Sequence, residues 1–136
     1  MSSPTIASTF QHRVPVRWGD LDAFNHVNNA NYLRYLEETR LHWLRTFVTT
    51  WDDMAAAPVM AAVQLNYRAP INWPAEVLVT QTVTRLGTTS LTIDHRIESA
   101  DGEILHVDGH VVLVWIDRAS GQPVPLPEAL RAAIRL

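Results

Sequence analysis

The stretch that decides the fold runs from Asn31 to Val48 and reads "NYLRYLEETRLHWLRTFV". Its apolar side chains recur at the spacing of an amphipathic helix, and no glycine or proline interrupts it. The apolar stripe comprises Tyr32, Leu36, Trp43 and Phe47, with Leu33, Leu44 and Val48 beside it. No other stretch of the chain shows this pattern at comparable length. The sequence therefore predicts one long helix, and the width of the stripe indicates that the helix is largely buried.

The rest of the chain is dominated by segments in which side chains alternate between two faces, a pattern typical of strands. One such segment precedes the helix and four follow it, at residues 10–18, 59–68, 76–85, 91–99 and 104–117. We expect tight turns between the four later strands, among them an Asp-Gly hairpin turn at "ADGE". Strands joined in this way predict an antiparallel sheet with one apolar face, and only the long helix is large enough to cover that face. The expected fold class is α+β, with a curled antiparallel sheet wrapped around one helix.

The length of 136 residues indicates a single domain that spans the chain, with residues 1–9 as a loose tail. The net charge is −3, and the eleven basic residues are arginines spread singly along the chain, which argues against a nucleic-acid-binding protein. Cysteine is absent, and this excludes disulfides and thiolate metal sites. Because neither a signal peptide nor a membrane-spanning segment is apparent, we expect no membrane partner and a cytoplasmic location.

Short polar side chains crowd the junction between the first strand and the helix, "WGDLDAFNHVNNANY" at residues 18–32. One interpretation is structural, because asparagine caps helices and aspartate bonds to the backbone of turns. The candidates for these roles are Asn28, Asn29 and Asn31 for the cap and Asp20 and Asp22 for turns. The other interpretation is catalytic. The first amides of a helix have no partner within it, and beside a carboxylate they can polarise a carbonyl group that is then attacked.

The residues around this junction resemble acyl-CoA thioesterases of the hotdog-fold superfamily, in the 4-hydroxybenzoyl-CoA thioesterase-like group. The similarity is clearest in "VRWGDLDAFNHVNNANYLRYLEETR", residues 16–40, which contains the pattern Asp-x-x-x-His-Val-Asn-Asn-x-x-Tyr of one branch. The pattern falls on Asp22, His26, Val27, Asn28, Asn29 and Tyr32. Segments 63–79 and 112–131 also resemble the family, so the similarity runs over nearly the whole chain, from Val14 to Arg131.

The resemblance implies a hotdog fold and the hydrolysis of an acyl-CoA thioester to a carboxylic acid and free coenzyme A. It places the essential carboxylate, a general base or nucleophile, on Asp22 and the carbonyl-polarising amide on Asn29. We expect His26, Tyr32 and Arg68 to contact the substrate. Coenzyme A is part of the substrate, so we expect no separate cofactor and no metal. The resemblance also implies a homodimer with active sites at the subunit boundary, and many members pair their dimers into tetramers.

Several polar residues near the helix have a second interpretation. The alternative role of His26 is to stabilise the loop by hydrogen bonds rather than to contact the substrate. The alternative role of Asn29 is to cap the helix rather than to bind the thioester carbonyl through its amide. Another hotdog branch carries its catalytic carboxylate on the central helix, which makes Glu37 and Glu38 candidates for that role. The structural interpretation of these two residues is ion pairing, for instance between Glu38 and His42.

Polar residues outside the junction supply further candidates. His106, Asp108 and His110 alternate on one strand face, a spacing that suits a metal site as well as a polar outer face. His95 lies in an apolar row, and we interpret it as a half-buried, hydrogen-bonded histidine. The candidates for contacts with the phosphates of coenzyme A are Arg68, Arg85, Arg96 and Arg118.

Two other functions are compatible with the same scaffold. One is a non-catalytic module that binds acyl-CoA or an acyl carrier protein, because a fold does not determine a function. The other is a hotdog dehydratase or hydratase, which needs a second acid–base partner for Asp22 that the sequence does not show. Release of free thiol from an acyl-CoA separates hydrolysis from both alternatives.

Overall fold

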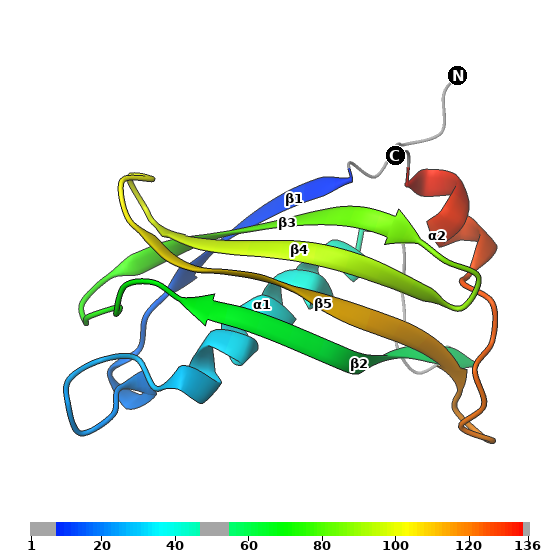
Figure 1. Cartoon of the computed structure of the whole chain (residues 1–136), viewed down its shortest axis with the longest axis horizontal. Helices are drawn as coiled ribbons and strands as arrows, with labels where there is room; N and C mark the ends of the chain where they lie inside the picture. The colour runs from blue at the N-terminus through cyan, green and yellow to red at the C-terminus, as the bar shows by residue number, and fades with distance from the viewer. Residues whose placement is uncertain (1–7, 47–54, 135–136) are drawn as a thin grey trace.

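The computed structural model describes residues 8–46 and 55–134. A five-stranded antiparallel sheet curls along one long helix, α1, which spans Asn29–Leu44 and lies across one face of the sheet (Figure 1). The strands are β1 at Thr9–Pro15, β2 at Ala56–Tyr67, β3 at Glu76–Leu86, β4 at Ser90–Ser99 and β5 at Leu105–Asp117. A short 3-10 helix, η1, covers Trp18–Asp20, and a second α-helix, α2, covers Glu128–Ala133 near one end of the sheet. This arrangement confirms the predicted α+β hotdog fold. The described helices lack the length and hydrophobicity of a membrane-spanning segment.

The sheet order is β1-β3-β4-β5-β2, so β1 and β2 are its two edges. β3, β4 and β5 follow one another as hairpins, as the turn signals predict. The expected tight turn between β2 and β3 is wrong, because β2 pairs with β5 and β3 pairs with β1 on its other side. The connecting segment 68–75 contains two prolines, which cannot donate to a strand ladder, and it runs outside the sheet.

The helix α1 begins at the cluster of asparagines. Asn28 is the N-cap, and its side-chain oxygen accepts a 2.9 Å hydrogen bond from the amide of Ala30. The buried residues of the helix are Tyr32, Tyr35, Leu36, Thr39, Arg40, Trp43 and Leu44. They recur every three or four residues, so the predicted amphipathic helix with one broad buried side is confirmed.

The helix ends at Leu44, earlier than the predicted end at Val48. The amide and the hydroxyl of Thr46 both donate to the carbonyl of Trp43, at 3.0 and 2.6 Å, and these bonds close the last turn. The carbonyls of the last turn are thereby satisfied without another helical turn. Phe47 and Val48 lie outside the described residues.

Two strands depart from the predicted alternation. β1 ends at Pro15, and its expected continuation to Trp18 is wrong, because η1 turns the chain and leaves Trp18 73% exposed. In β2 a bulge follows Met60, which therefore lies opposite Leu113 of β5. Cross-strand partners share a face, so Met60, and not Val59, belongs to the row on the helix side of the sheet.

Two apolar clusters fill the space between α1 and the sheet. The first cluster takes Tyr32, Tyr35 and Leu36 from the helix, and the second takes Trp43 and Leu44. The clusters therefore follow one another along the helix axis. The first lies beside the polar junction that precedes the helix, and it positions that junction against the sheet.

A layer of buried polar side chains separates the two clusters. Gln81 of β3 and His95 of β4 are cross-strand partners, and Arg40 of α1 is buried near His95. Gly109 of β5 is opposite His95, and a Cβ there would collide with the carbonyl oxygen of Gln64. Within the described residues neither ring nitrogen of His95 has a hydrogen-bond partner, so the expectation of a half-buried, hydrogen-bonded histidine is wrong. Burial, with a smaller contribution from Arg40, lowers the pKa of His95 to about 3.

Candidate functional site

The loop that leads from β1 into α1 is held by Asp20. One carboxylate oxygen of Asp20 accepts a 2.6 Å hydrogen bond from the Tyr35 hydroxyl and a 3.0 Å bond from the Arg17 amide. The carbonyl of Asp20 accepts bonds from the amide of Asn28 and the side chain of Asn31, at 2.9 and 2.8 Å. Asp20 thus ties the loop to the first turns of the helix, which confirms its structural interpretation.

Asp22 combines a turn role with a free oxygen atom. Its Oδ1 accepts hydrogen bonds from the amides of Phe24 and His26, at 2.8 and 3.3 Å. Asn25, inside this turn, has a φ of +64°, a left-handed conformation that asparagine tolerates. The Oδ2 atom of Asp22 has no hydrogen-bond partner in the described part of the chain. One oxygen therefore orients the carboxylate, while the other remains able to accept a proton.

The start of α1 presents an amide without a partner. The Asn28 cap binds the amide of Ala30, and the Asn31 amide donates to the Asn28 carbonyl at 2.8 Å. By contrast, no acceptor for the Asn29 amide lies within residues 8–46 and 55–134. The Tyr67 hydroxyl of β2 donates a 3.1 Å bond to the Asn29 carbonyl and so attaches the helix start to the sheet. Because aligned peptide dipoles make this end of the helix positive, the free amide favours an oxygen that carries negative charge.

Asp22 and Asn29 both line one pocket of about 340 Å³ at the start of α1. The side chains assigned from the sequence to catalysis or substrate binding all belong to its lining: Asp22, His26, Asn29, Tyr32 and Arg68. They come from the loop before α1, from the helix itself and from the segment after β2, so only the folded chain brings them together. The roles assigned to them stay predictions.

Two tyrosine rings line this pocket, and one of them escaped the sequence analysis. Tyr32 is 3% exposed and packs edge-on against Tyr67, with ring centroids 5.1 Å apart. Burial raises the pKa of Tyr32 above its ordinary value. The alternation of side chains in β2 could have predicted the position of Tyr67. It is the last residue of β2 on the same face as Leu65, and it therefore borders the loop that meets the helix.

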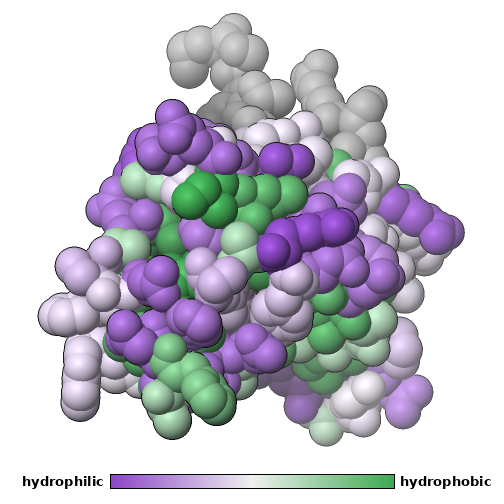
Figure 2. Space-filling view, turned by 60° about the vertical axis from the view of Figure 1, so that its left-hand side comes forward, coloured by the Kyte–Doolittle hydropathy of each residue, from purple (hydrophilic) through white to green (hydrophobic). Residues whose placement is uncertain are grey.

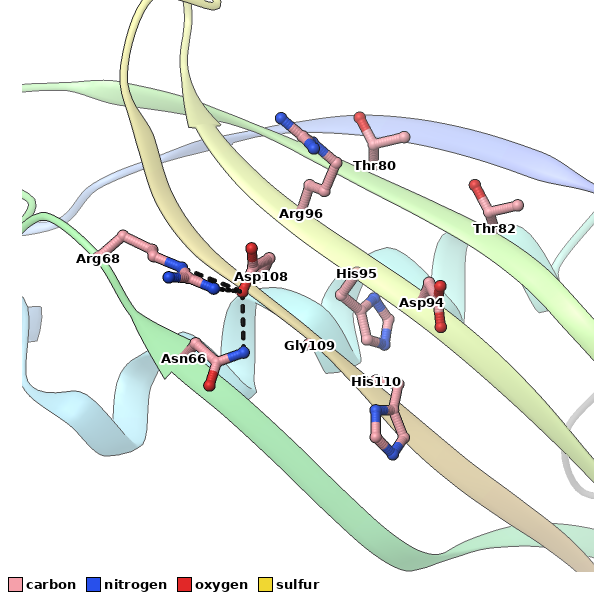
Figure 3. A pocket seen from close by; sticks show the side chains of 10 residues that line it. All are labelled: Asn66, Arg68, Thr80, Thr82, Asp94, His95, Arg96, Asp108, Gly109 and His110. Atoms are coloured by element: carbon pink, nitrogen blue, oxygen red, sulfur yellow. Dashed lines mark hydrogen bonds and ion pairs between the residues drawn. The ribbon is translucent and has the colours of Figure 1, made fainter.

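Arg68 lies at the border of a second, polar pocket of about 530 Å³ on the sheet face away from α1 (Figure 3). Its Nη2 and Nε atoms are 3.2 and 3.3 Å from Oδ1 of Asp108, and Asn66 donates to the same oxygen at 3.0 Å. The hydrogen bonds from Asn66 and Arg68 lower the pKa of Asp108. The Arg68 side chain is 53% exposed, so its guanidinium remains accessible from solvent.

The other sequence candidates do not line the pocket that contains Asp22. His106 is buried because a bulge in β5 turns it out of the outer row, and its Nδ1 lies 3.0 Å from the Ala69 carbonyl. The predicted row that joins it to Asp108 and His110 is therefore wrong. The remaining candidates outside the lining are Glu37, Glu38, Arg85, Arg96 and Arg118.

One known protein family matches the part of the chain that contains this site and most of the fold. The model of the thioesterase-like superfamily matches residues 16–134, which include the polar junction, α1 and four of the five strands. The chain belongs to the thioesterase-like superfamily. Membership confirms, at the level of the family, the predicted thioester hydrolase and its hotdog fold.

Relatives of this superfamily member are similar over most of their length. The long-chain acyl-CoA thioesterase FadM of Escherichia coli (strain K12) is 30% identical, over 89% of this chain and 93% of FadM. Among solved structures, the thioesterase candidate PA2801 from Pseudomonas aeruginosa is 38% identical with a TM-score of 0.86, over 91% of this chain and 96% of that one. An acyl-CoA thioesterase candidate from Xanthomonas campestris is 44% identical with a TM-score of 0.73, over 85% of this chain and 98% of that one.

Proposed function

We propose that this protein hydrolyses acyl-CoA thioesters and releases a carboxylic acid and free coenzyme A. The observation that carries the proposal is that Asp22, which has a free carboxylate oxygen, and Asn29, which has an unpaired amide, line one pocket. The substrate class is supported by the relatives, since FadM is a long-chain acyl-CoA thioesterase that matches most of the chain. In this proposal the chain acts as a single domain in the cytoplasm.

The geometry of the pocket suits attack by water on a thioester carbonyl. The carbonyl oxygen lies against the Asn29 amide, which stabilises the negative charge that develops in the tetrahedral intermediate. Asp22 takes a proton from the attacking water through Oδ2 and returns it to the departing thiolate of coenzyme A. Its Oδ1 stays bound to two loop amides, which hold the carboxylate in one orientation. In the alternative mechanism, Asp22 uses the same free oxygen as a nucleophile.

The surroundings of the pocket suggest how the substrate lies. The acyl group lies beside Tyr32 and Leu36, where the first apolar cluster excludes water. The coenzyme A end leaves past Arg68, whose exposed guanidinium borders the outer pocket. An exposed ion pair such as Arg68–Asp108 stabilises a protein only weakly, so this arginine can turn to a phosphate at small cost.

The edge strand β2 supports a homodimer. β2 is 12 residues long and lies at an edge of the sheet, and long apolar edge strands pair readily with another chain. Its large apolar side chains with 41–48% exposure are Val59, Met60, Val63 and Tyr67. On the face that Figure 2 shows, apolar patches lie among hydrophilic residues. Because Tyr67 belongs both to β2 and to the pocket, a second copy joined at β2 lies next to the site. The further pairing of dimers into a tetramer stays a prediction.

Thiol release from a panel of acyl-CoAs tests the proposal. The panel contains short, long and aromatic acyl groups, and acyl carrier protein thioesters are included to identify the carrier. We expect catalytic release of free coenzyme A from at least one class. Binding without thiol release would establish a non-catalytic module instead. Consumption of an enoyl-CoA without thiol release would establish a hydratase.

A further inference from the structure

Three side chains with metal-ligating atoms converge on the side of α1 that faces β1. Nitrogen atoms of His12 and His42 and a carboxylate oxygen of Glu38 lie within 4.8 Å of one another. Glu38 and His42 are one helical turn apart and therefore share a face of α1. The edge strand β1 contributes His12. We propose that these three residues bind a divalent transition-metal ion, with zinc as the best match.

The distances within the cluster suit a zinc ion after a small rearrangement. Nε2 of His12 lies 3.1 Å from Oε2 of Glu38. Two ligands of a tetrahedral zinc ion, each at about 2.0–2.2 Å from the metal, are about 3.4 Å apart. The His42 ring stacks on His12 with centroids 4.1 Å apart and an interplanar angle of 29°. A metal lies in the plane of the imidazole that binds it, so coordination requires this stack to open. The ring torsion that opens the stack is broad, and its rotation costs little.

The chemistry of the three groups favours a transition-metal ion such as zinc. Two imidazoles and one carboxylate without a thiolate suit zinc, whereas calcium and magnesium prefer a set of oxygen ligands. No hydrogen bond engages the His42 ring within the described residues, so its nitrogen atoms are available. The side chains of His12 and Glu38 are 24% and 40% exposed, which lets an ion enter and a water molecule complete the coordination. The sequence analysis expected no metal and paired Glu38 with His42, whereas the structure pairs Glu38 with His12.

The position of the cluster indicates a structural role for the metal. Glu38 follows the helix start at Asn29 by nine residues, which corresponds to about 13 Å along the helix axis. An ion held there does not reach a carbonyl group at the Asn29 amide. It instead joins α1 to the edge strand β1. An ion that binds only the folded chain stabilises it by mass action, in proportion to the logarithm of its free concentration.

Metal titration of the full-length, untagged protein tests this proposal directly. The protein is stripped with a chelator, dialysed, and titrated with zinc chloride by calorimetry and with cobalt chloride by absorption spectroscopy. We expect one zinc ion per chain and the intense visible absorption of four-coordinate cobalt. Glu38→Gln and His42→Gln each remove one ligand, and we expect each to weaken zinc binding by at least about tenfold. The matched control is His110→Gln on the outer face of β5, which we expect to bind zinc as the wild type does.

The same experiments define what overturns the proposal. The proposal is overturned if the wild-type protein does not bind zinc at one ion per chain. It is also overturned if both ligand variants bind zinc with the same affinity as the wild type. Loss of binding in His110→Gln also overturns it, because the ion then binds elsewhere. If one ligand variant does not fold, the zinc affinity of the other ligand variant decides. Thermal unfolding adds an independent readout, since zinc should raise the Tm of the wild type but not that of His42→Gln. None of these measurements depends on thioesterase activity.

Discussion

The hydroxyl of Tyr35 donates a 2.6 Å hydrogen bond to the carboxylate of Asp20, and this bond joins the middle of α1 to the loop that carries Asp22. Tyr35 is 5% exposed. Burial, and then the bond to Asp20, raises the pKa of Tyr35 well above its ordinary value. The position of the proposed catalytic carboxylate therefore depends on a buried contact outside the pocket.

Tyr35→Phe removes only the hydroxyl group and tests this dependence. A hydrogen bond to a charged group contributes about 1.5–3 kcal/mol, so we expect the free energy of unfolding to fall by about this amount. Urea denaturation measures the change. Tyr67→Phe is the matched control, because its 3.1 Å bond to the Asn29 carbonyl involves no charge and its loss should cost about 1 kcal/mol. A Tyr35→Phe protein as stable as the wild type would contradict the prediction.

The same tyrosine predicts a loss of stability at alkaline pH. The pKa of Tyr35 in the folded chain lies above the value of 10.0 that applies to an unperturbed tyrosine. Above that pH the unfolded chain loses a proton that the folded chain keeps, so the free energy of unfolding decreases as pH rises. We expect the decrease to be smaller in Tyr35→Phe, although Tyr32, whose pKa is also raised, contributes in both proteins. Denaturation curves at several pH values above 10 measure it, and equal slopes would refute the assignment.

His95 predicts the opposite dependence on the acid side. Burial lowers its pKa from 6.5 to about 3 in the folded chain. Between these values the unfolded chain binds a proton that the folded chain does not, so the free energy of unfolding falls as pH decreases. The contribution of one such group is at most about 1.4 kcal/mol per pH unit. Glutamine takes up no proton, so in His95→Gln we expect the free energy of unfolding to depend less steeply on pH over this range. Denaturation curves at several pH values measure this dependence, and an unchanged slope would show that His95 does not cause it.

Asp22→Asn tests the proposed chemistry with little disturbance of the loop. Asparagine keeps the Oδ1 acceptor for the amides of Phe24 and His26 but cannot accept a proton from water. We expect normal folding and a loss of about 10²–10⁴-fold in turnover, the usual effect of removing a general base. Thiol release measures the turnover, and thermal unfolding checks the fold. Asp94→Asn, on the outer face of β4, is the control and should retain activity. Full activity in folded Asp22→Asn protein would end the proposed mechanism.

A charged residue on the edge strand tests the homodimer. We expect Val63→Glu to separate the protein into monomers, because an uncompensated charge on β2 opposes strand pairing between copies. Size-exclusion chromatography with light scattering measures the mass, and thiol release shows whether the site needs the partner. Ile104→Glu changes an apolar residue of similar exposure outside β2 and should leave the assembly intact. A dimeric Val63→Glu protein would place the interface elsewhere.

Much of the fold was predictable because its elements depend on near neighbours in the chain. The apolar stripe of α1 and the alternation of β3, β4 and β5 are local patterns, and their observed bounds lie close to the predicted ones. The prediction failed locally at the ends of β1 and α1, and its failures in sheet topology are non-local. The pairing of β2 with β5 and the bulge after Met60 depend on which strands meet across the sheet. No pattern within a single segment specifies such a pairing.

The candidate site divides in the same way. The sequence by itself determined the residue types of the junction, a set of asparagine candidates for the helix cap and the resemblance that singled out Asp22, because these lie within a few residues of one another. Only the tertiary structure decided that Tyr67 reaches the helix start, that Tyr35 holds Asp20, and that His12 meets Glu38. These three contacts join residues that are 38, 15 and 26 positions apart in the chain. Such residues come into contact only when the sheet curls around the helix and buries the apolar side chains beside them.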